Sequence, residues 1–324
     1  MQKSLKILVV RFSSIGDIVL TTPIVRCLNI QKNAEIHFLT KYKYKEILEN
    51  NPHIKRIHTL DNSISDILNK LKEENYDYII DLHNNLRSNL LYKLRVPSYK
   101  VCKSNFKKFL LIRFGINLLS EEHTVDRYMK TVKSLFVKND GKGLDYYIDP
   151  DTKINFNINQ RFIAWSLAST HNLKKLSVDK IINVCNHIKM PIVLLGSNKE
   201  IEDAEIIIKS CSNTSIHNFC GKLSLDQSSY LIQNSELLLT NDTGLMHIAA
   251  AFRKKIISFW GCTKPILGFS PYFSDSKSFE ILADDSYRPC SKHGKSCRYG
   301  SNICISRIKS ESIITCLRSL GFIE

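Results

Sequence analysis

The sequence predicts an α/β protein with two open parallel sheets. Its length of 324 residues allows two domains of about 150 residues each. Strand-like apolar runs alternate with helix-forming runs in both halves, which is typical of parallel sheets covered on both faces. A polar stretch near residues 145–158 separates the two alternations. We therefore expect one domain over residues 1–150 and a second over residues 151–324.

The first half opens on residues 6–12, KILVVRF, a β-branched apolar run of the length of a buried parallel strand. The loop Ser13 to Asp17 follows, and residues 18–28 have helical spacing, with Pro23 tolerated if the first turn is irregular. Further strands are expected at 34–40, 54–60 and 77–83, and helices at 42–51 and 64–76.

The second half repeats this alternation. The expected strands are 162–168, 191–196, 237–240 and 254–261, and the expected helices are 178–188, 202–211, 226–235, 245–252 and about 306–320. The last of these helices is amphipathic, and we expect it to pack back on the first domain.

The stretch from 237 to 252, LLLTNDTGLMHIAAAF, predicts a buried strand, a tight turn and a helix. Asp242 or Thr243 is placed to cap the helix, and Gly244 allows close approach to the backbone. Amides of the first turn and the helix dipole favour an anion such as phosphate. His247 lies four residues after Thr243, on the same side of the first turn. An ordinary capped helix has the same spacing, so both interpretations stay open.

A second polar turn, Ser13 to Asp17, follows the first strand and enters a helix. Asp17 is either a helix cap or a general base that faces a ligand. The chain has no GxGxxG here, which argues against a dehydrogenase.

Other candidate loops lie at the carboxyl ends of expected strands, where ligands of parallel sheets bind. Lys174 and Lys175 follow strand 162–168, and an ammonium group there either neutralises a leaving diphosphate or is simply solvated. Gly196 ends strand 191–196 and permits either nucleotide approach or a tight turn. The end of strand 77–83 carries Asp81, His83, Asn84, Asn85, Arg87 and Ser88.

The composition is that of a globular enzyme, 43% hydrophobic and 24% charged. The chain has no uncharged apolar run of about 18 residues, the length needed to span a membrane, and the N-terminus lacks signal-peptide features. We therefore expect a cytoplasmic protein.

The formal charge of +15 favours an anionic partner, and residues 1–150 carry 25 basic and 16 acidic side chains. Eight basic residues fall within 87–113, and apolar residues at 110–116 are interleaved or follow. Such a segment suits an anionic membrane surface, although a solvated basic face is the alternative. Nucleic acid is not expected, because the segment has no recognisable binding motif.

The ten cysteines are too sparse for a disulfide scaffold. Cys290, Cys297 and Cys304 recur at intervals of seven, with His293 between the first two. Zinc sites favour four ligands in CxxC-like pairs, so the spacing favours free thiols over a metal site.

Taken together, these residues resemble glycosyltransferase family 9, the ADP-heptose:lipopolysaccharide heptosyltransferases. The similarity runs through KILVVRFSSIGDIVLTTP, IIDLHNNLRS, HTVDRY, LLTNDTGLMHIAAAF and GCTKP, and it spans nearly the whole chain. Its most specific feature is the pairing of an S-x-G-D loop with a D-[ST]-G-x-x-H turn.

The resemblance implies the GT-B architecture, in which two Rossmann-like domains face each other across a central cleft. It implies an inverting transfer without a metal or cofactor, from an ADP-sugar to a lipopolysaccharide inner-core or other lipid-linked acceptor. Heptose is the sugar that the family name suggests. The anionic acceptor would place the enzyme peripherally on the inner face of the cytoplasmic membrane.

Carried over by motif, Asp17 would be the base. Lys174, or Lys175 if the motif slips, would stabilise the departing phosphate. The donor would be bound by Lys174, Gly196, Asp242, Thr243, Gly244 and His247, and the acceptor by Ser13, Ser14, Gly16, Asn85 and Arg87.

Two alternatives stay open. Another GT-B enzyme, such as a nucleotide-sugar epimerase, would also bind a sugar nucleotide but would need no acceptor. A non-catalytic protein that binds anionic surfaces would use only the basic excess, and its binding would weaken with salt.

Overall fold

The computed structural model describes residues 4–61, 63–213, 215–283, 288–300 and 303–323. The chain forms two compact units. The first unit comprises Met1–Ser104 and Glu122–Tyr147, and the second comprises Asn105–Glu121 and Ile148–Glu324. The chain thus passes to the second unit within the polar stretch expected as a linker, but residues 105–121 group with the second unit although the sequence placed them in the first domain.

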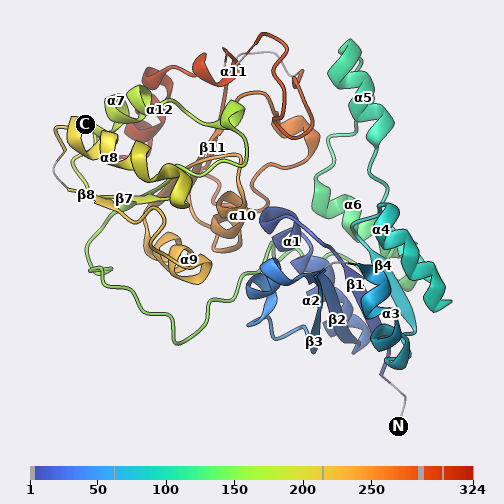
Figure 1. Ribbon diagram of the computed structural model, residues 1–324. Helices are drawn as coiled ribbons and strands as arrows, with labels where there is room; N and C mark the ends of the chain where they lie inside the picture. Colours follow the sequence, from blue (N-terminus) through green and yellow to red (C-terminus); the bar gives the residue numbers. More distant parts are fainter. Residues whose placement is uncertain (1–3, 62, 214, 284–287, 301–302, 324) are drawn as a thin grey trace. The chain divides into compact units, whose positions relative to one another are not determined.

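The first unit contains a five-stranded parallel sheet in the order β3-β2-β1-β4-β5 (Figure 1). Its strands are β1 (Lys6–Val10), β2 (Glu35–Lys41), β3 (Arg56–Leu60), β4 (Tyr78–Asp81) and β5 (Ser98–Lys100). The chain turns from one side of β1 to the other between β3 and β4, which is the switch point of a Rossmann-like sheet.

The helices of this unit are α1 (Ile15–Val19), α2 (Thr22–Lys32), α3 (Ile64–Glu73), α4 (Leu86–Asn89) and α6 (Thr124–Thr131), with 3₁₀ helices η1 (Tyr42–Leu48), η2 (Leu90–Leu94) and η3 (Lys133–Leu135). The single helix expected at 18–28 is therefore two helices. Pro23 lies in the first turn of α2, where its missing N–H is not needed, and so it starts a helix instead of bending one. The helix expected at 42–51 is the shorter η1.

The core of the first unit lies against the central strand β1. Leu8 and Val10 are fully buried and pack with Leu39, Ile64 and Leu71. This apolar layer fixes the direction of β1, and hence the position of the polar loop that follows it.

The second unit contains a six-stranded parallel sheet in the order β11-β10-β9-β6-β7-β8. Its strands are β6 (Ile163–Ser166), β7 (Ile192–Leu195), β8 (Ile216–Asn218), β9 (Leu237–Asn241), β10 (Ile256–Trp260) and β11 (Phe279–Leu282). Counted within the unit, this is the 3-2-1-4-5-6 order of the Rossmann fold, with its switch point between β6 and β9. The predicted α/β class with two parallel sheets is confirmed.

The helices of the second unit are α5 (Asn105–Phe114), α7 (Val178–Cys185), α8 (Ile201–Ser210), α9 (Leu225–Asn234), α10 (Gly244–Ala251), α11 (Ile303–Ser306) and α12 (Ser310–Ser319), with 3₁₀ helices η4 (Asn172–Lys174), η5 (Asn198–Glu200) and η6 (Pro265–Leu267). No helix in the described ranges is long and apolar enough to cross a membrane.

The last helix, α12, uses its apolar side within its own unit, where it contacts α7 and β11. Ile313 and Leu317 are fully buried in the core of the second sheet. Helix α12 thus belongs to the core of the second unit. A contact between the outer side of α12 and the first domain stays a prediction.

Helix α5 is joined to the second unit by the segment after β11. The Arg288 guanidinium donates to the carbonyl of Ile112 at 3.2 Å, and Arg298 donates to the same oxygen at 3.0 Å. The ammonium of Lys292 donates to Asn105 Oδ1 at 2.8 Å. These bonds join residues about 180 positions apart in the chain, which explains why local sequence patterns missed them.

Candidate active site

The first group of candidate residues lies at the switch point of the first sheet. Strands β1 and β4 are parallel neighbours, so the loops that follow them leave the same edge of the sheet. Arg11, directly after β1, donates from Nη1 to the carbonyl of Leu82 after β4 at 2.7 Å. The structure thereby brings the Asp17 loop and the loop of Asn85 and Arg87 together.

Asp17 is held by a cation and by its own turn. Its Oδ1 lies 2.8 Å from Arg11 Nη2, and its side chain keeps 23% exposure. Its Oδ2 accepts from the backbone N–H of Ser14 at 3.1 Å and from the Ser14 hydroxyl at 2.9 Å. Asp17 therefore does stabilise the helix entrance, as one interpretation held, and it also keeps a partly exposed carboxylate.

The pKa of Asp17 lies below its ordinary value. Burial opposes ionisation, but the charge of Arg11 and the hydrogen bonds from Ser14 outweigh it. The carboxylate is accordingly ionised at neutral pH, which is the form that a general base needs.

Sequence reasoning missed Arg11. Its Nε also donates to the Ser13 carbonyl at 2.7 Å, and its guanidinium lies 5.9 Å from the ring centre of Tyr128. The available signal was a lone charge at the end of an apolar strand. Sequence reasoning gave His83 no role of its own. Burial, and to a smaller extent the charge of Arg11, lowers the pKa of its imidazole to about 3, so the ring is neutral.

The loop after β4 is ordered by Asp81, whose side chain is buried. Its carboxylate accepts from the amides of His83 and Asn84 at 3.0 and 2.7 Å and from the Ser88 hydroxyl at 2.6 Å. Asn85 Oδ1 caps α4 by accepting from Ser88 N at 2.9 Å. Arg87 is exposed. Asn85 thus has a local structural role, and Arg87 is the cation that this loop presents to solvent.

The second group of candidates lies at the switch point of the second sheet, between β6 and β9. Lys174 Nζ lies 2.6 Å from Asp242 Oδ2, with the two side chains 11% and 12% exposed. Thr263, after β10, donates from its hydroxyl to the same carboxylate oxygen at 2.9 Å. Asp242 therefore joins the loops that follow three neighbouring strands.

The two adjacent lysines point to different partners. Lys174 pairs with Asp242, whereas Lys175 pairs with Asp203 and lies 3.9 Å from Glu200. Of the two, Lys174 lies at the turn before α10. The structure brings Lys174 to the predicted phosphate site, and its role there stays a prediction.

The N-terminus of α10 begins at Thr243, as expected, but the side chain does not cap it. The Thr243 hydroxyl makes no hydrogen bond to the first turn and lies 3.2 Å from the hydroxyl of Thr240. The first-turn amides are therefore not occupied by the Thr243 side chain, and they are the groups that bind anions at a helix start. Gly244 opens the helix, and His247 is buried one turn later.

Two neighbours of this turn have structural explanations. Asn241 accepts from Leu176 N at 3.2 Å and donates to the Leu167 carbonyl at 3.4 Å, which fixes the lysine loop against β9. A Cβ on Gly196 would lie 2.9 Å from Glu200 Cβ and 3.0 Å from Cys220 Sγ. The chain's own packing thus accounts for glycine at position 196.

The sequence profile of glycosyltransferase family 9 (heptosyltransferase) matches residues 64–298. The chain belongs to glycosyltransferase family 9. Lipopolysaccharide heptosyltransferase 1 of Campylobacter coli is 23% identical to it, over 98% of this chain and 99% of the relative. The predicted family and enzyme class are therefore confirmed, and the protein is a heptosyltransferase-like glycosyltransferase.

Solved structures of this family share the fold. A family 9 glycosyltransferase from Veillonella parvula DSM 2008 superposes with a TM-score of 0.80 at 22% identity, covering 99% of this chain and 98% of that one. ADP-heptose lps heptosyltransferase II of E. coli gives a TM-score of 0.72 at 19% identity, with 98% of each chain covered. The fold class predicted from sequence agrees with these neighbours.

Proposed function

We propose that this glycosyltransferase moves heptose from ADP-heptose to an anionic, lipid-linked saccharide, with inversion at the anomeric carbon and without a metal at the reaction centre. The observation that carries the proposal is the Lys174–Asp242 pair, 2.6 Å apart, at the start of α10. A cation beside the first turn of a helix suits a diphosphate leaving group. The names of the E. coli and C. coli relatives supply the sugar, the nucleotide and the lipopolysaccharide acceptor.

In the proposed donor complex, amides of Thr243 and Gly244 hold phosphate oxygens at the helix dipole. Asp242 is itself an anion, so its carboxylate would repel the diphosphate if it faced it alone. Its bonds to Lys174 and Thr263 give it a different task, which is to orient the ammonium. Lys174 would then neutralise charge that develops on the leaving diphosphate.

In the proposed transfer step, Asp17 accepts the proton of the acceptor hydroxyl as its oxygen attacks the anomeric carbon. The bond from that carbon to the diphosphate oxygen breaks, and its electron pair leaves with ADP. A single displacement inverts the carbon and needs one base. Arg11 and Ser14 support this role because they keep the Asp17 carboxylate ionised and fix its direction.

We also propose that α5 rests on the anionic inner face of the cytoplasmic membrane. Large apolar side chains are exposed on α5 and just after it: Phe106, Phe109, Phe114, Ile116 and Leu118, with exposures of 70%, 54%, 59%, 50% and 51%. Lys107 and Arg113 are exposed on the same helix. Apolar insertion combined with about 1 kcal/mol for each basic residue near the headgroups would hold the enzyme at its acceptor.

The donor proposal is tested by calorimetric titration with ADP, UDP and GDP, each with EDTA and then with Mg²⁺. We expect ADP to bind in preference to UDP and GDP, with no gain from Mg²⁺. Preference for UDP or GDP would contradict the ADP-sugar, and a requirement for Mg²⁺ would contradict metal-independent transfer.

The catalytic proposal is tested by Asp17→Asn, which is nearly isosteric. We expect ADP affinity to stay within about twofold, while turnover with ADP-heptose and a lipopolysaccharide acceptor falls by at least about 10²-fold, the usual range for loss of a general base. Unchanged turnover would remove Asp17 from the mechanism.

The membrane proposal is tested by sedimentation with phosphatidylglycerol vesicles. The Phe106→Ser/Phe109→Ser variant should lose most vesicle binding. Phe136→Ser is the matched control, because Phe136 is 84% exposed but lies in the first unit. Equal losses in the two variants, or no loss in either, would contradict the assignment to α5.

A further inference from the structure

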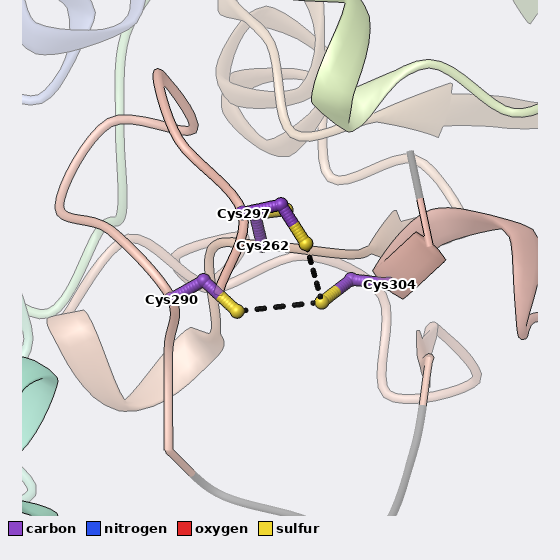
Figure 2. A group of neighbouring side chains, drawn as sticks. All are labelled: Cys262, Cys290, Cys297 and Cys304. Carbon is purple, nitrogen blue, oxygen red and sulfur yellow. Dashed lines mark hydrogen bonds between the residues drawn. The ribbon is translucent and has the colours of Figure 1, made fainter. Parts of the chain in front are cut away.

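Four cysteine sulfurs converge in the second unit. They belong to Cys262, Cys290, Cys297 and Cys304, and their Sγ atoms all lie within 4.8 Å of one another. Figure 2 shows the four side chains gathered in one place, with the Cys304 sulfur between those of Cys290 and Cys297. Sequence spacing suggested only three of these residues together with His293. The exposed His293 lies outside the group, and Cys262, at the end of β10, takes the fourth position.

The distances fit a tetrahedral thiolate site. With metal–sulfur bonds of about 2.3 Å, two sulfurs of a tetrahedron are about 3.8 Å apart. The Sγ atoms of Cys290 and Cys304 lie 3.4 Å apart, as do those of Cys297 and Cys304, and no pair exceeds 4.8 Å. A disulfide needs about 2.05 Å. All ten cysteines are free thiols.

The surroundings also suit a metal–thiolate centre. The backbone N–H groups of Cys290 and Ser291 donate to the Cys262 carbonyl at 2.8 and 3.3 Å, which ties the segment of Cys290 to the loop after β10. Cys262 and Cys304 are 0% and 2% exposed and the other two are partly buried, so the centre is largely shielded from solvent.

The charge of the segment that carries Cys290 and Cys297 also favours a metal–thiolate centre. Four thiolates around a divalent ion carry a net charge of −2. The segment that supplies two of them has four basic residues and no acidic residue between positions 288 and 298: Arg288, Lys292, Lys295 and Arg298. A segment of this charge favours an anionic centre over a neutral one.

We propose that Cys262, Cys290, Cys297 and Cys304 bind one thiophilic divalent metal ion as a structural centre. Zn²⁺ is the expected ion and Fe²⁺ the alternative. Binding releases up to four thiol protons to solvent as the four sulfur–metal bonds form. The filled shell leaves no position for substrate, so the ion acts by holding the chain.

The chain that it would hold touches the donor site. Cys262 immediately precedes Thr263, which donates to Asp242 at 2.9 Å. A Cβ on Gly294, between two of the ligands, would lie 2.5 Å from Lys174 Cε and 2.7 Å from Lys174 Cγ. The loop between Cys290 and Cys297 therefore packs against the Lys174 side chain. We infer that the metal holds this loop against Lys174.

The test begins with the full chain, purified under reducing conditions with Zn²⁺ present during expression. We expect about one metal ion per chain by mass spectrometry. Replacement by Co²⁺ should give the visible absorption of a tetrahedral thiolate complex. A metal content near zero, or a Co²⁺ spectrum of octahedral oxygen ligands, would overturn the proposal.

Variants then locate the ion. Cys290→Ser and Cys297→Ser should lower the metal content at least about tenfold, because thiolate is the ligand that these ions need. Cys316→Ser is the matched control, since Cys316 is also partly buried in the second unit but lies outside the group. Metal content that is equal in all three variants would contradict these ligands.

A second measurement covers the case in which the serine variants fold poorly. A mercurial thiol reagent in the presence of a zinc indicator should release one ion from the intact wild-type chain as the four ligand thiols react, in addition to the other accessible thiols. The same treatment should lower the melting temperature. Release of no ion, or detection of Cys290–Cys304 or Cys297–Cys304 disulfides in the protein as purified, would overturn the site.

Discussion

Gly294 gives a sharp test of the contact between the cysteine loop and Lys174. Its φ is +78°, a backbone conformation that costs a non-glycine residue about 1–2 kcal/mol. An alanine Cβ there would lie 2.5, 2.7 and 3.1 Å from three carbons of the Lys174 side chain. Because that side chain is flexible, we expect Gly294→Ala to push Lys174 aside and to leave the fold intact.

The size of the effect follows from what Lys174 is proposed to do. Hydrogen bonds to charged groups contribute about 1.5–3 kcal/mol. Displacing the ammonium from the diphosphate should therefore weaken ADP binding by about 10- to 100-fold, as measured by calorimetry. The metal content should not change, because no sulfur ligand is altered.

Gly321→Ala is the matched control. Gly321 has a φ of +76°, nearly the same as Gly294, but a Cβ there meets nothing within 4 Å. Both variants carry the strain of a positive φ, Gly294→Ala also loses the Lys174–Asp242 pair, and only Gly294→Ala should lose ADP affinity. Wild-type affinity in Gly294→Ala, or equal losses of affinity in the two variants, would refute the reasoning.

Three further outcomes are expected. Lys174→Ala should weaken ADP binding by about 10- to 100-fold in calorimetry, while Lys175→Ala should not, because Lys175 pairs with Asp203; similar losses would assign the phosphate to neither lysine in particular. Arg11→Gln should raise the pKa of Asp17, since burial remains and the neighbouring charge is lost, and the acid limb of the kcat/KM profile should move to higher pH; an unmoved limb would contradict Asp17 as the titrating base. Burial lowers the pKa of His58 from 6.5 to about 4, so the unfolded chain binds more protons in this range and the melting temperature should fall as pH drops from 6.5 toward 4. His58→Gln should show a shallower fall, and a slope equal to that of the wild type would assign the effect to other groups.

Much of the donor region was predictable because its signals are local. The run from 237 to 252 encodes a strand, a turn and a helix within sixteen residues, and the structure has β9 and α10 there. Alternating apolar runs likewise identified the central strands of both sheets, since buried parallel strands are apolar on both faces.

The edges of the sheets and the partners of the site were not predictable in the same way. The three-residue strands β5 and β8 are too short to show a period, and no local pattern indicated that Lys174 would form an ion pair with Asp242, 68 positions away. Arg11 lay inside the expected strand 6–12, and the strand pattern assigned no function to its charge. Its meaning depends on Asp17 and on a carbonyl 71 residues away, which only the fold brings together.

For the cysteine group, local sequence spacing argued against a site that the fold assembles. The spacing of Cys290, Cys297 and Cys304 argued against zinc because no CxxC pair and no fourth cysteine lay nearby in sequence. The fourth ligand comes from the end of β10, and the backbone N–H of Cys290 donates to the Cys262 carbonyl at 2.8 Å. Local spacing rules therefore fail when the loop after a distant strand supplies a ligand.

A structural metal is compatible with metal-independent transfer, because a structural ion and a catalytic ion need different coordination shells. A metal that assists the leaving group needs an open coordination position, whereas four cysteines fill a tetrahedral shell. The charge on the diphosphate would instead be met by Lys174 and the first turn of α10, which the cysteine loop supports through Gly294. ADP binding without Mg²⁺ and one tightly held ion per chain are thus expected together. Removing that ion with a thiol reagent should weaken ADP binding, while added Mg²⁺ should not restore it; recovery with Mg²⁺ would mean that the metal acts on the diphosphate directly.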